Sequence, residues 1–216
     1  MPAGANRAIL FRPMSTTANK RHFSMLRDFH LADFFTIANG CCGVVAIFAA
    51  IRFVESGHSG SLYLAVALIP VALVFDVLDG RVARWRHKAS SIGRELDSLA
   101  DIISFGVAPA TIAYASGLRS GLDQTILIFF VACGLSRLAR YNVTAEELIG
   151  AGGVVRYFEG TPIPTSVMPL TVNLVLWRYD CLGTVGLATV GFHWASALYF
   201  VSGCLMVSRT LRIPKP

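Results

Sequence analysis

The sequence has 216 residues, of which 54% are hydrophobic and only 15% are charged, and its mean hydropathy is +0.58. These values exclude an ordinary soluble domain and predict a membrane protein. The net charge of +6 indicates contact with anionic lipid headgroups and no nucleic-acid partner, because the basic residues are spread over loop ends and form no motif that reads nucleic acid.

The N-terminal segment is basic. Residues 1–27 contain five Lys and Arg residues and no acid, which fits either a basic cytosolic tail at 1–21 or a mitochondrial transit peptide. Residues 22–31 mix apolar and charged side chains, and we expect a short helix there that lies in the membrane interface. The chain from 22 to 216 shows no internal repeat or linker, so we expect one domain.

Six apolar stretches approach the ~20 residues that span a bilayer. They lie at 31–54, 61–77, 96–118, 122–138, 164–177 and 182–207. Counted together with the span ends that hold Arg52 and Arg137, the segments before, between and after them carry five, one, five, one, three, one and three Lys and Arg residues. This alternation predicts an all-α, polytopic membrane helix bundle with six transmembrane helices and both termini in the cytosol.

Polar residues in or beside the first span have two interpretations. Asp33 and Asn39 either line the nucleotide or headgroup side of a cavity, or they anchor the helix and hydrogen-bond a neighbouring one. The cysteines and histidines of the chain are less informative. The five cysteines form no Cys-x-x-Cys pair and the five histidines are scattered, so we expect packing roles for the cysteines and no metal site.

Four aspartates stand out in residues 75–101, which read FDVLDGRVARWRHKASSIGRELDSLAD. Asp76 with Asp79, and Asp97 with Asp101, are spaced so that each pair lies on one face of a helix. One uncompensated acid at membrane depth costs about 2.5–3.5 kcal/mol, and like charges add repulsion. A bound cation would remove this cost, and carboxylates without Cys or His favour magnesium, manganese or calcium over zinc.

The residues between the acids suit a phosphate-bearing ligand. Gly80, Ala83 and Gly93 are small and would let a backbone or a bulky ligand approach the acids. Arg81 and Arg84 add positive charge beside them.

A second polar region follows the fourth span. Arg137 and Arg140 lie three residues apart on one helical face, where they either clamp a phosphate or carboxylate, or anchor the helix by snorkelling. Further on, Gly160, Pro162 and Pro164 predict a tight turn into the fifth span, which Pro164 and Pro169 interrupt.

Eight positions of the acidic stretch form the pattern Asp-x2-Asp-Gly-x2-Ala-Arg-x8-Gly-x3-Asp-x3-Asp. They are Asp76, Asp79, Gly80, Ala83, Arg84, Gly93, Asp97 and Asp101. The pattern closely resembles the signature of the CDP-alcohol phosphotransferases, integral membrane enzymes that join a CDP-activated group to an alcohol and release CMP. A solvated hairpin of acids and bases would leave the flanking apolar runs and the small residues unexplained.

Four further segments resemble one branch of that family. LADFFTIANGCCG, DSLADIISFGVAPA, GLSRLARYNV and YFEGTPIPT are similar to the phosphatidylserine synthase branch, and most similar to its fungal endoplasmic-reticulum members. The resemblance implies transfer of a phosphatidyl group from CDP-diacylglycerol to L-serine, with magnesium or manganese. It further implies a homodimer, embedded in membrane lipid, whose site faces the cytosol.

The resemblance also implies roles for single residues. Those matching Asp76, Asp79 and Asp97 are metal ligands, and the one matching Asp101 touches a second metal and is the general base. Gly80, Ala83, Arg84 and Gly93 would receive CDP-diacylglycerol, and Arg137 or Arg140 would supply a cation for the serine carboxylate.

Other functions stay open from the residues alone. The same core would accept inositol or glycerol phosphate in place of serine. A transporter with an acidic cation site is an alternative from another class, but such proteins often have two matching halves, and this chain has one acid cluster.

Overall fold

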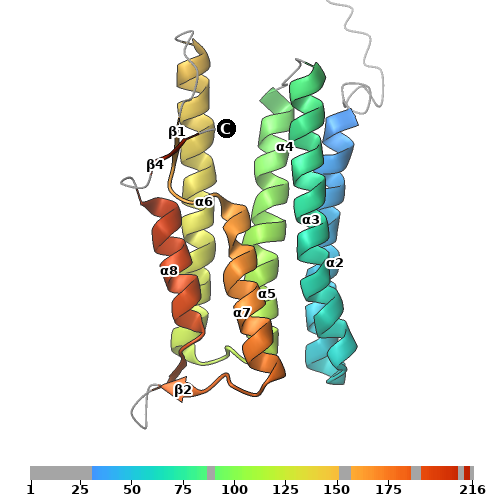
Figure 1. Cartoon of the computed structure of the whole chain (residues 1–216), viewed down its shortest axis with the longest axis vertical. Coiled ribbons are helices and arrows are strands. Elements are labelled where there is room, and N and C mark those ends of the chain that lie inside the picture. Colours follow the sequence, from blue (N-terminus) through green and yellow to red (C-terminus); the bar gives the residue numbers. More distant parts are fainter. Residues whose placement is uncertain (1–30, 87–90, 151–156, 186–190, 209–211, 215–216) are drawn as a thin grey trace, which may run out of the picture.

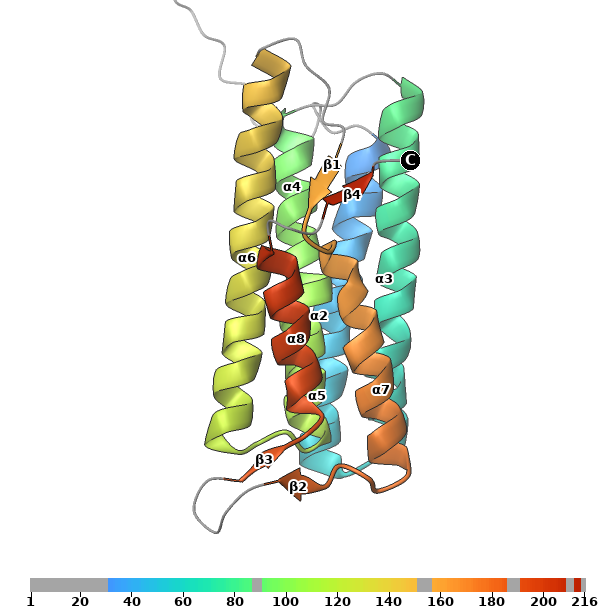
Figure 2. The same ribbon diagram turned by 60° about the vertical axis from the view of Figure 1, so that its left-hand side comes forward.

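The computed structural model describes residues 31–86, 91–150, 157–185, 191–208 and 212–214. The basic tail and the interfacial helix, predicted up to residue 31, lie outside these residues but for the first residue of α2. The described part is an upright bundle of helices (Figures 1 and 2). The predicted helical class is therefore confirmed.

Helices make up most of the described residues. They are α2 (Leu31–Ser56), α3 (Ser59–Arg86), α4 (Ser91–Asp101), the π-helix η1 (Ile102–Val107), α5 (Ala108–Ser116), α6 (Gly121–Gly150), the 3-10 helix η2 (Ile163–Ser166), α7 (Val167–Arg178) and α8 (Ser196–Val207). The strands form two antiparallel ribbons. β1 (Tyr157–Glu159) pairs with β4 (Arg212–Pro214), and β2 (Thr184–Val185) pairs with β3 (Phe192–His193).

Four helical segments of the described residues are long and apolar enough to cross a membrane. They are Asp33–Ser56, Ser59–Val82, Ile92–Ser116 and Gly121–Thr144. These segments match the first four predicted spans, although α3 and α6 continue beyond 77 and 138 because their polar ends remain helical. A membrane protein with four candidate spans is what the structure establishes.

The structure has helix throughout the fifth predicted span but in only part of the sixth. The fifth coincides with η2 and α7. The sixth is wrong in its first half, because the described residues of 182–207 are helical only from Ser196, and Thr184–Val185 and Phe192–His193 form the β2–β3 ribbon. Apolar content alone does not separate a helix from a short strand, and the β-branched residues Thr184 and Val185 favour the strand.

The α4–η1–α5 segment is the centre of the bundle. It contacts α2 on one side and α6 and α7 on the other. In the most apolar 18-residue stretch of the span Ile92–Ser116, 61% of the residues are buried. In the corresponding stretches of the other three spans, only 28–33% are buried. A side chain that the centre directs inward is therefore shielded by several helices.

Small residues allow these helices to approach closely. Alanine is the most frequent residue in the apolar core of the described part, for example Ala46, Ala50, Ala65 and Ala113. Large apolar side chains such as Phe48 and Ile128 instead point outward and are exposed. Small residues inside and large apolar residues outside are typical of helices that pack in lipid.

Gly43 marks the closest approach of α2 to the π-helix. A Cβ at this position would lie 2.6 Å from Ser104 Oγ and 2.8 Å from Ser104 Cα. The Ser104 hydroxyl donates a hydrogen bond of 2.8 Å to the backbone oxygen of Asn39, one turn away. Because glycine has no side chain, the backbone of α2 packs directly against η1.

The turn before the fifth span is confirmed. Gly160 has φ +74°, and a Cβ there would collide with the backbone oxygen of Met206 in α8. The Thr161 N–H donates to Leu205 O at 3.2 Å, and Pro162 is extended before η2 begins. Glycine is needed because this backbone conformation disfavours any side chain.

A group of hydrogen bonds, which we call the polar latch, lies at the end of the bundle opposite to the start of α4. Ser120 and Asp123 exchange backbone and side-chain hydrogen bonds of 3.1 Å each, which caps the N-terminus of α6. Asp123 also accepts the His193 backbone N–H at 3.0 Å and lies 2.7 Å from His193 Nδ1. This latch fixes the start of α8 to the start of α6.

We expect Gly43→Ala to lower the free energy of unfolding by about 1–3 kcal/mol, because the added methyl group overlaps the backbone of η1. Thermal unfolding of the purified protein in detergent, followed by circular dichroism, measures the change. Gly121→Ala is the control, since a Cβ there would meet no described atom within 4 Å. Equal unfolding temperatures of the two variants would contradict the close contact.

Candidate active site

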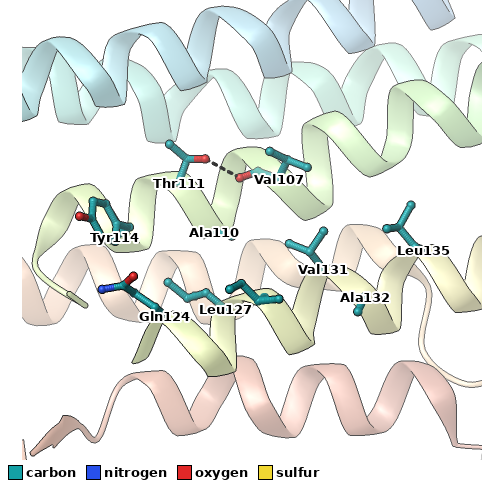
Figure 3. A pocket seen from close by; sticks show the side chains of 10 residues that line it. Val107, Ala110, Thr111, Tyr114, Gln124, Leu127, Val131, Ala132 and Leu135 are labelled. Atoms are coloured by element: carbon teal, nitrogen blue, oxygen red, sulfur yellow. Dashed lines mark hydrogen bonds between the residues drawn. The ribbon is translucent and has the colours of Figure 1, made fainter. Parts of the chain in front are cut away.

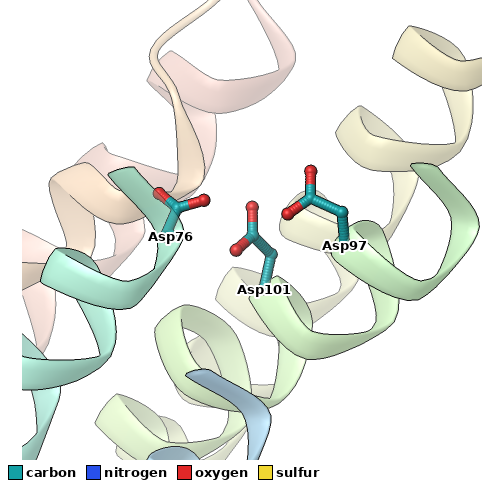
Figure 4. A group of neighbouring side chains, drawn as sticks. All are labelled: Asp76, Asp97 and Asp101. Carbon is teal, nitrogen blue, oxygen red and sulfur yellow. The ribbon is translucent and has the colours of Figure 1, made fainter. Parts of the chain in front are cut away.

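The four aspartates lie on two neighbouring segments of the bundle. Asp76 and Asp79 are on α3, and Asp97 and Asp101 are on α4. Figure 4 shows the side chains of Asp76, Asp97 and Asp101 directed toward one space between these helices. One carboxylate oxygen from each of the three lies within 4.8 Å of the other two. We call these three residues the acid cluster.

Asp79 belongs to a different contact. Its side chain is only 6% exposed, and its Oδ2 accepts a hydrogen bond of 2.9 Å from Thr36 Oγ1 on α2. Asp79 is not part of the three-oxygen group among the described residues. Its role as a fourth metal ligand therefore stays a prediction.

The two acids of α4 have different surroundings. Asp101 is buried, and its Oδ1 accepts a hydrogen bond of 3.1 Å from Asn39 Nδ2. The Oδ1 of Asp97 is also buried, but it receives no hydrogen bond from any residue within the described ranges. A buried acceptor without a partner costs about 1–3 kcal/mol, so Asp97 favours a ligand in the cluster.

Repulsion within the acid cluster is large. Two unit charges about 4 Å apart repel by about 4 kcal/mol at an effective dielectric constant of about 20. Three carboxylates would be unstable together unless a cation or protons neutralised them. The donor set fits a hard divalent cation such as magnesium or manganese, because it consists of oxygen atoms alone.

The structure describes the surroundings of only some of the residues that are predicted to bind the nucleotide. Gly80 follows Asp79 in α3, and a Cβ on it would meet no other described side chain or neighbouring element within 4 Å. Gly93 is half-buried on α4, and Arg81 is exposed. Ala83 and Arg84 belong to α3, but their side chains lie outside the described part. Space beside the acids is therefore present at Gly80.

α6 carries two predicted substrate-binding arginines, and Arg137 is the one that the structure relates to the acid cluster. Arg137 and Arg140 are half-buried. The Nε of Arg137 is buried without a hydrogen-bond partner among the described residues, and Arg137 lies within electrostatic reach of Asp101. A buried guanidinium with an unused N–H is suited to an anionic ligand.

A polar contact between α4 and α6 was not predicted. Asn142 Nδ2 lies 3.0 Å from Ser98 Oγ and 3.3 Å from Glu95 Oε1. Ser98 follows Asp97 directly, so this contact fixes the relative position of the acids and the arginine-bearing helix. Nothing in the sequence pairs residues 44 positions apart.

Thr36 is a second residue that the sequence analysis missed. It lies three residues after Asp33 and three before Asn39, and all three side chains are buried. The signal was the three-residue spacing of polar groups in an apolar span, which places them on one helical face. In the structure Thr36 and Asn39 each bind one aspartate of the two predicted pairs.

An apolar groove lies apart from the acid cluster. It runs between α5 and α6 with a volume of about 490 Å³. Figure 3 shows apolar side chains along it, such as Val107, Val131 and Leu135, with Tyr114 and Gln124 toward one end. No carboxylate lines the groove, so it is not the site of phosphate chemistry.

The fold and the acid cluster define a class: an integral membrane protein whose bundle centre holds carboxylates suited to a divalent cation. A sequence model of the CDP-alcohol phosphatidyltransferase family matches residues 29–202. The chain belongs to this family, and the predicted resemblance is confirmed.

Three relatives of the chain share one enzyme name. The CDP-diacylglycerol–serine O-phosphatidyltransferase of Saccharomyces cerevisiae is 43% identical over 215 residues, which cover 93% of this chain and 76% of the yeast protein. The enzyme so named in Methanocaldococcus jannaschii is 34% identical over 148 residues, covering 68% of this chain and 62% of that protein. The Bacillus subtilis enzyme of this name is 32% identical over 160 residues, covering 71% and 81%.

We expect each of Asp76→Asn, Asp97→Asn and Asp101→Asn to weaken manganese binding by about tenfold or more, because each removes a charged ligand. Electron paramagnetic resonance of Mn²⁺ with the purified protein in detergent measures the bound ion. Glu55→Gln is the control, since Glu55 is an exposed acid at the other end of α2. Unchanged affinity in Asp97→Asn would show that the cluster does not bind the ion.

Proposed function

We propose that the chain transfers the phosphatidyl group of CDP-diacylglycerol to the hydroxyl group of L-serine, giving phosphatidylserine and CMP. The observation that carries the proposal is the convergence of Asp76, Asp97 and Asp101 at the family's signature positions. The names of the relatives support serine as the alcohol.

In this proposal Asp76, Asp79, Asp97 and Asp101 hold magnesium or manganese. A bound divalent ion would neutralise the diphosphate and stabilise the charge on departing CMP. Asp79 would bind the ion through its Oδ1, because its Oδ2 already accepts the hydrogen bond from Thr36.

The residues of the chain then have separate tasks. Asp101 accepts the proton of the serine hydroxyl, and the serine oxygen forms a bond to the phosphorus that carries the diacylglycerol. The bond from this phosphorus to the bridging oxygen breaks, and CMP leaves with the electron pair. Asp101 is buried while Asp76 and Asp97 are half-buried, and this shielding would limit the access of water that competes with serine.

Gly80, Ala83, Arg84 and Gly93 would bind the cytidine and phosphates of CDP-diacylglycerol. The space beside Gly80 supports this assignment. The acyl chains would remain in lipid between the helices, where outward side chains of the bundle are apolar.

Arg137 and Arg140 would bind the carboxylate of serine. The unused Nε–H of Arg137 and its proximity to the charge of Asp101 support Arg137 in particular. A zwitterion between them would place its carboxylate toward the arginines and its hydroxyl group toward the acid cluster.

We also propose six membrane spans, with α7 and α8 as the fifth and sixth, both termini in the cytosol, and one domain over 22–216. The alternation of basic residues along the chain supports this orientation. The resemblance of the sequence to the fungal endoplasmic-reticulum members of the family supports that location, and the proposed orientation would turn the acid cluster toward the cytosol. A homodimer is proposed from the resemblance to the family.

Membranes containing the protein, given CDP-diacylglycerol, labelled serine and manganese, should form labelled lipid and CMP in equal amounts. Asp97→Asn should lower kcat by about 10²-fold or more, because the diphosphate charge is no longer neutralised. Inositol and glycerol phosphate are tested in parallel arms. A higher rate with either of these alcohols, or activity that a chelator leaves unchanged, would overturn the proposal.

Arg137→Ala should raise the KM for serine by about 10–100-fold, because a charge-assisted hydrogen bond contributes about 1.5–3 kcal/mol. Steady-state kinetics at saturating CDP-diacylglycerol measures this change. Arg140→Ala is compared with it, and Arg178→Ala, an exposed residue at the end of α7, is the control. If the KM for serine stays unchanged in both Arg137→Ala and Arg140→Ala, the serine assignment is wrong.

A further inference from the structure

Asn39 touches both sides of the junction between α4 and the π-helix. Its side chain is fully buried, and its Nδ2 donates a hydrogen bond of 3.1 Å to Asp101, the last residue of α4. Its backbone oxygen accepts the hydrogen bond from Ser104, the third residue of η1. Asn39 of α2 is therefore hydrogen-bonded to the chain on both sides of the point where the α-helix changes into a π-helix.

The junction decides where Asp101 points. A π-helix has more residues per turn than an α-helix, so the side-chain directions shift where η1 begins. Asp101 stands immediately before this change, and its neighbours Asp76 and Asp97 repel it. Without a donor on one oxygen, the carboxylate would be free to turn away from the cluster.

The identity of the donor follows from chemistry. An ionised carboxylate only accepts hydrogen bonds, so an amide facing it must present its NH₂ group. The bond to Oδ1 leaves the second oxygen of Asp101 available to the cluster. Close packing supports the geometry, because Gly40 and Gly43 bring α2 against Ala100 and Ser104 on either side of Asp101.

We propose that Asn39 is a positioning residue that orients Asp101 for proton transfer and for binding of the ion. The inference rests on the proposed function, in which Asp101 is the general base. In this proposal Asn39 acts through Asp101, to which it is hydrogen-bonded, so its effect on the reaction is indirect. Removing its amide should lower kcat and leave the KM for CDP-diacylglycerol within about twofold.

The chain contains a matched control for this amide. Asn173 on α7 is also fully buried, and its Nδ2 donates a hydrogen bond of 2.8 Å to Ser116 at the end of α5. Asn173 lies among apolar residues such as Leu62, Ile112 and Leu170, and no acid lines that space. Loss of either amide removes one buried hydrogen bond, but only Asn39 is bonded to an acid of the cluster.

The experiment compares Asn39→Leu with Asn173→Leu, which keep the branched shape of the side chain and remove the donor. Asn39→Ala and Asn173→Ala are measured alongside in case the larger side chain prevents folding. We expect both positions to lower the unfolding temperature, and only the Asn39 variants to lower kcat, by about 10–100-fold. Equal kcat values for the two positions would overturn the proposal.

Manganese binding without substrate separates this inference from the proposed function. Electron paramagnetic resonance should show weaker Mn²⁺ binding in Asn39→Leu than in Asn173→Leu, because Asp101 is no longer oriented. If the unmodified protein made no lipid from serine, the proposed function would fail while this comparison still tested Asn39. Identical Mn²⁺ affinity in the two variants would contradict an orienting role.

Discussion

The structure depends on holding carboxylates together at the centre of an apolar bundle. Asp76, Asp97 and Asp101 come from two helices and bring oxygen atoms within 4.8 Å of one another. Their mutual repulsion and the loss of hydration both oppose this arrangement. It persists only if surrounding donors, together with a cation or protons, compensate, so the acids connect the packing of the helices to the proposed chemistry.

The first described helix supplies much of this compensation. Thr36 and Asn39 lie on one face of α2 and donate to Asp79 and Asp101, one acid from each helix. The helix can reach them because Gly43 lets its backbone approach η1. A face of polar and small residues in an apolar span therefore places the neutral donors Thr36 and Asn39 beside Asp79 and Asp101.

The carboxylates at the two ends of the bundle differ in their hydrogen-bond partners. Near the start of α4, Asp97 has a buried oxygen that receives no hydrogen bond from the described residues, and Arg137 lies close to Asp101, which leaves capacity for a cation and for anionic substrates. At the other end, Asp123 satisfies its oxygens with Ser120 and His193, and it joins α6 to α8. A satisfied carboxylate stabilises the fold, whereas an unsatisfied one such as Asp97 is available to bind a ligand.

The sequence by itself determined the membrane class, the first four helical spans, the turn at Gly160 and the two pairs of acids. These features depend on composition and on spacings of three or four residues, which local geometry fixes. Only the tertiary structure decided that Thr36 binds Asp79 and Asn39 binds Asp101, across 43 and 62 residues. It also decided the π-helix and the ribbon that replaces half of the sixth predicted span. The physical reason is that apolar helices are similar on all sides, so their relative rotation is set by the packing of small residues and buried hydrogen bonds between distant segments.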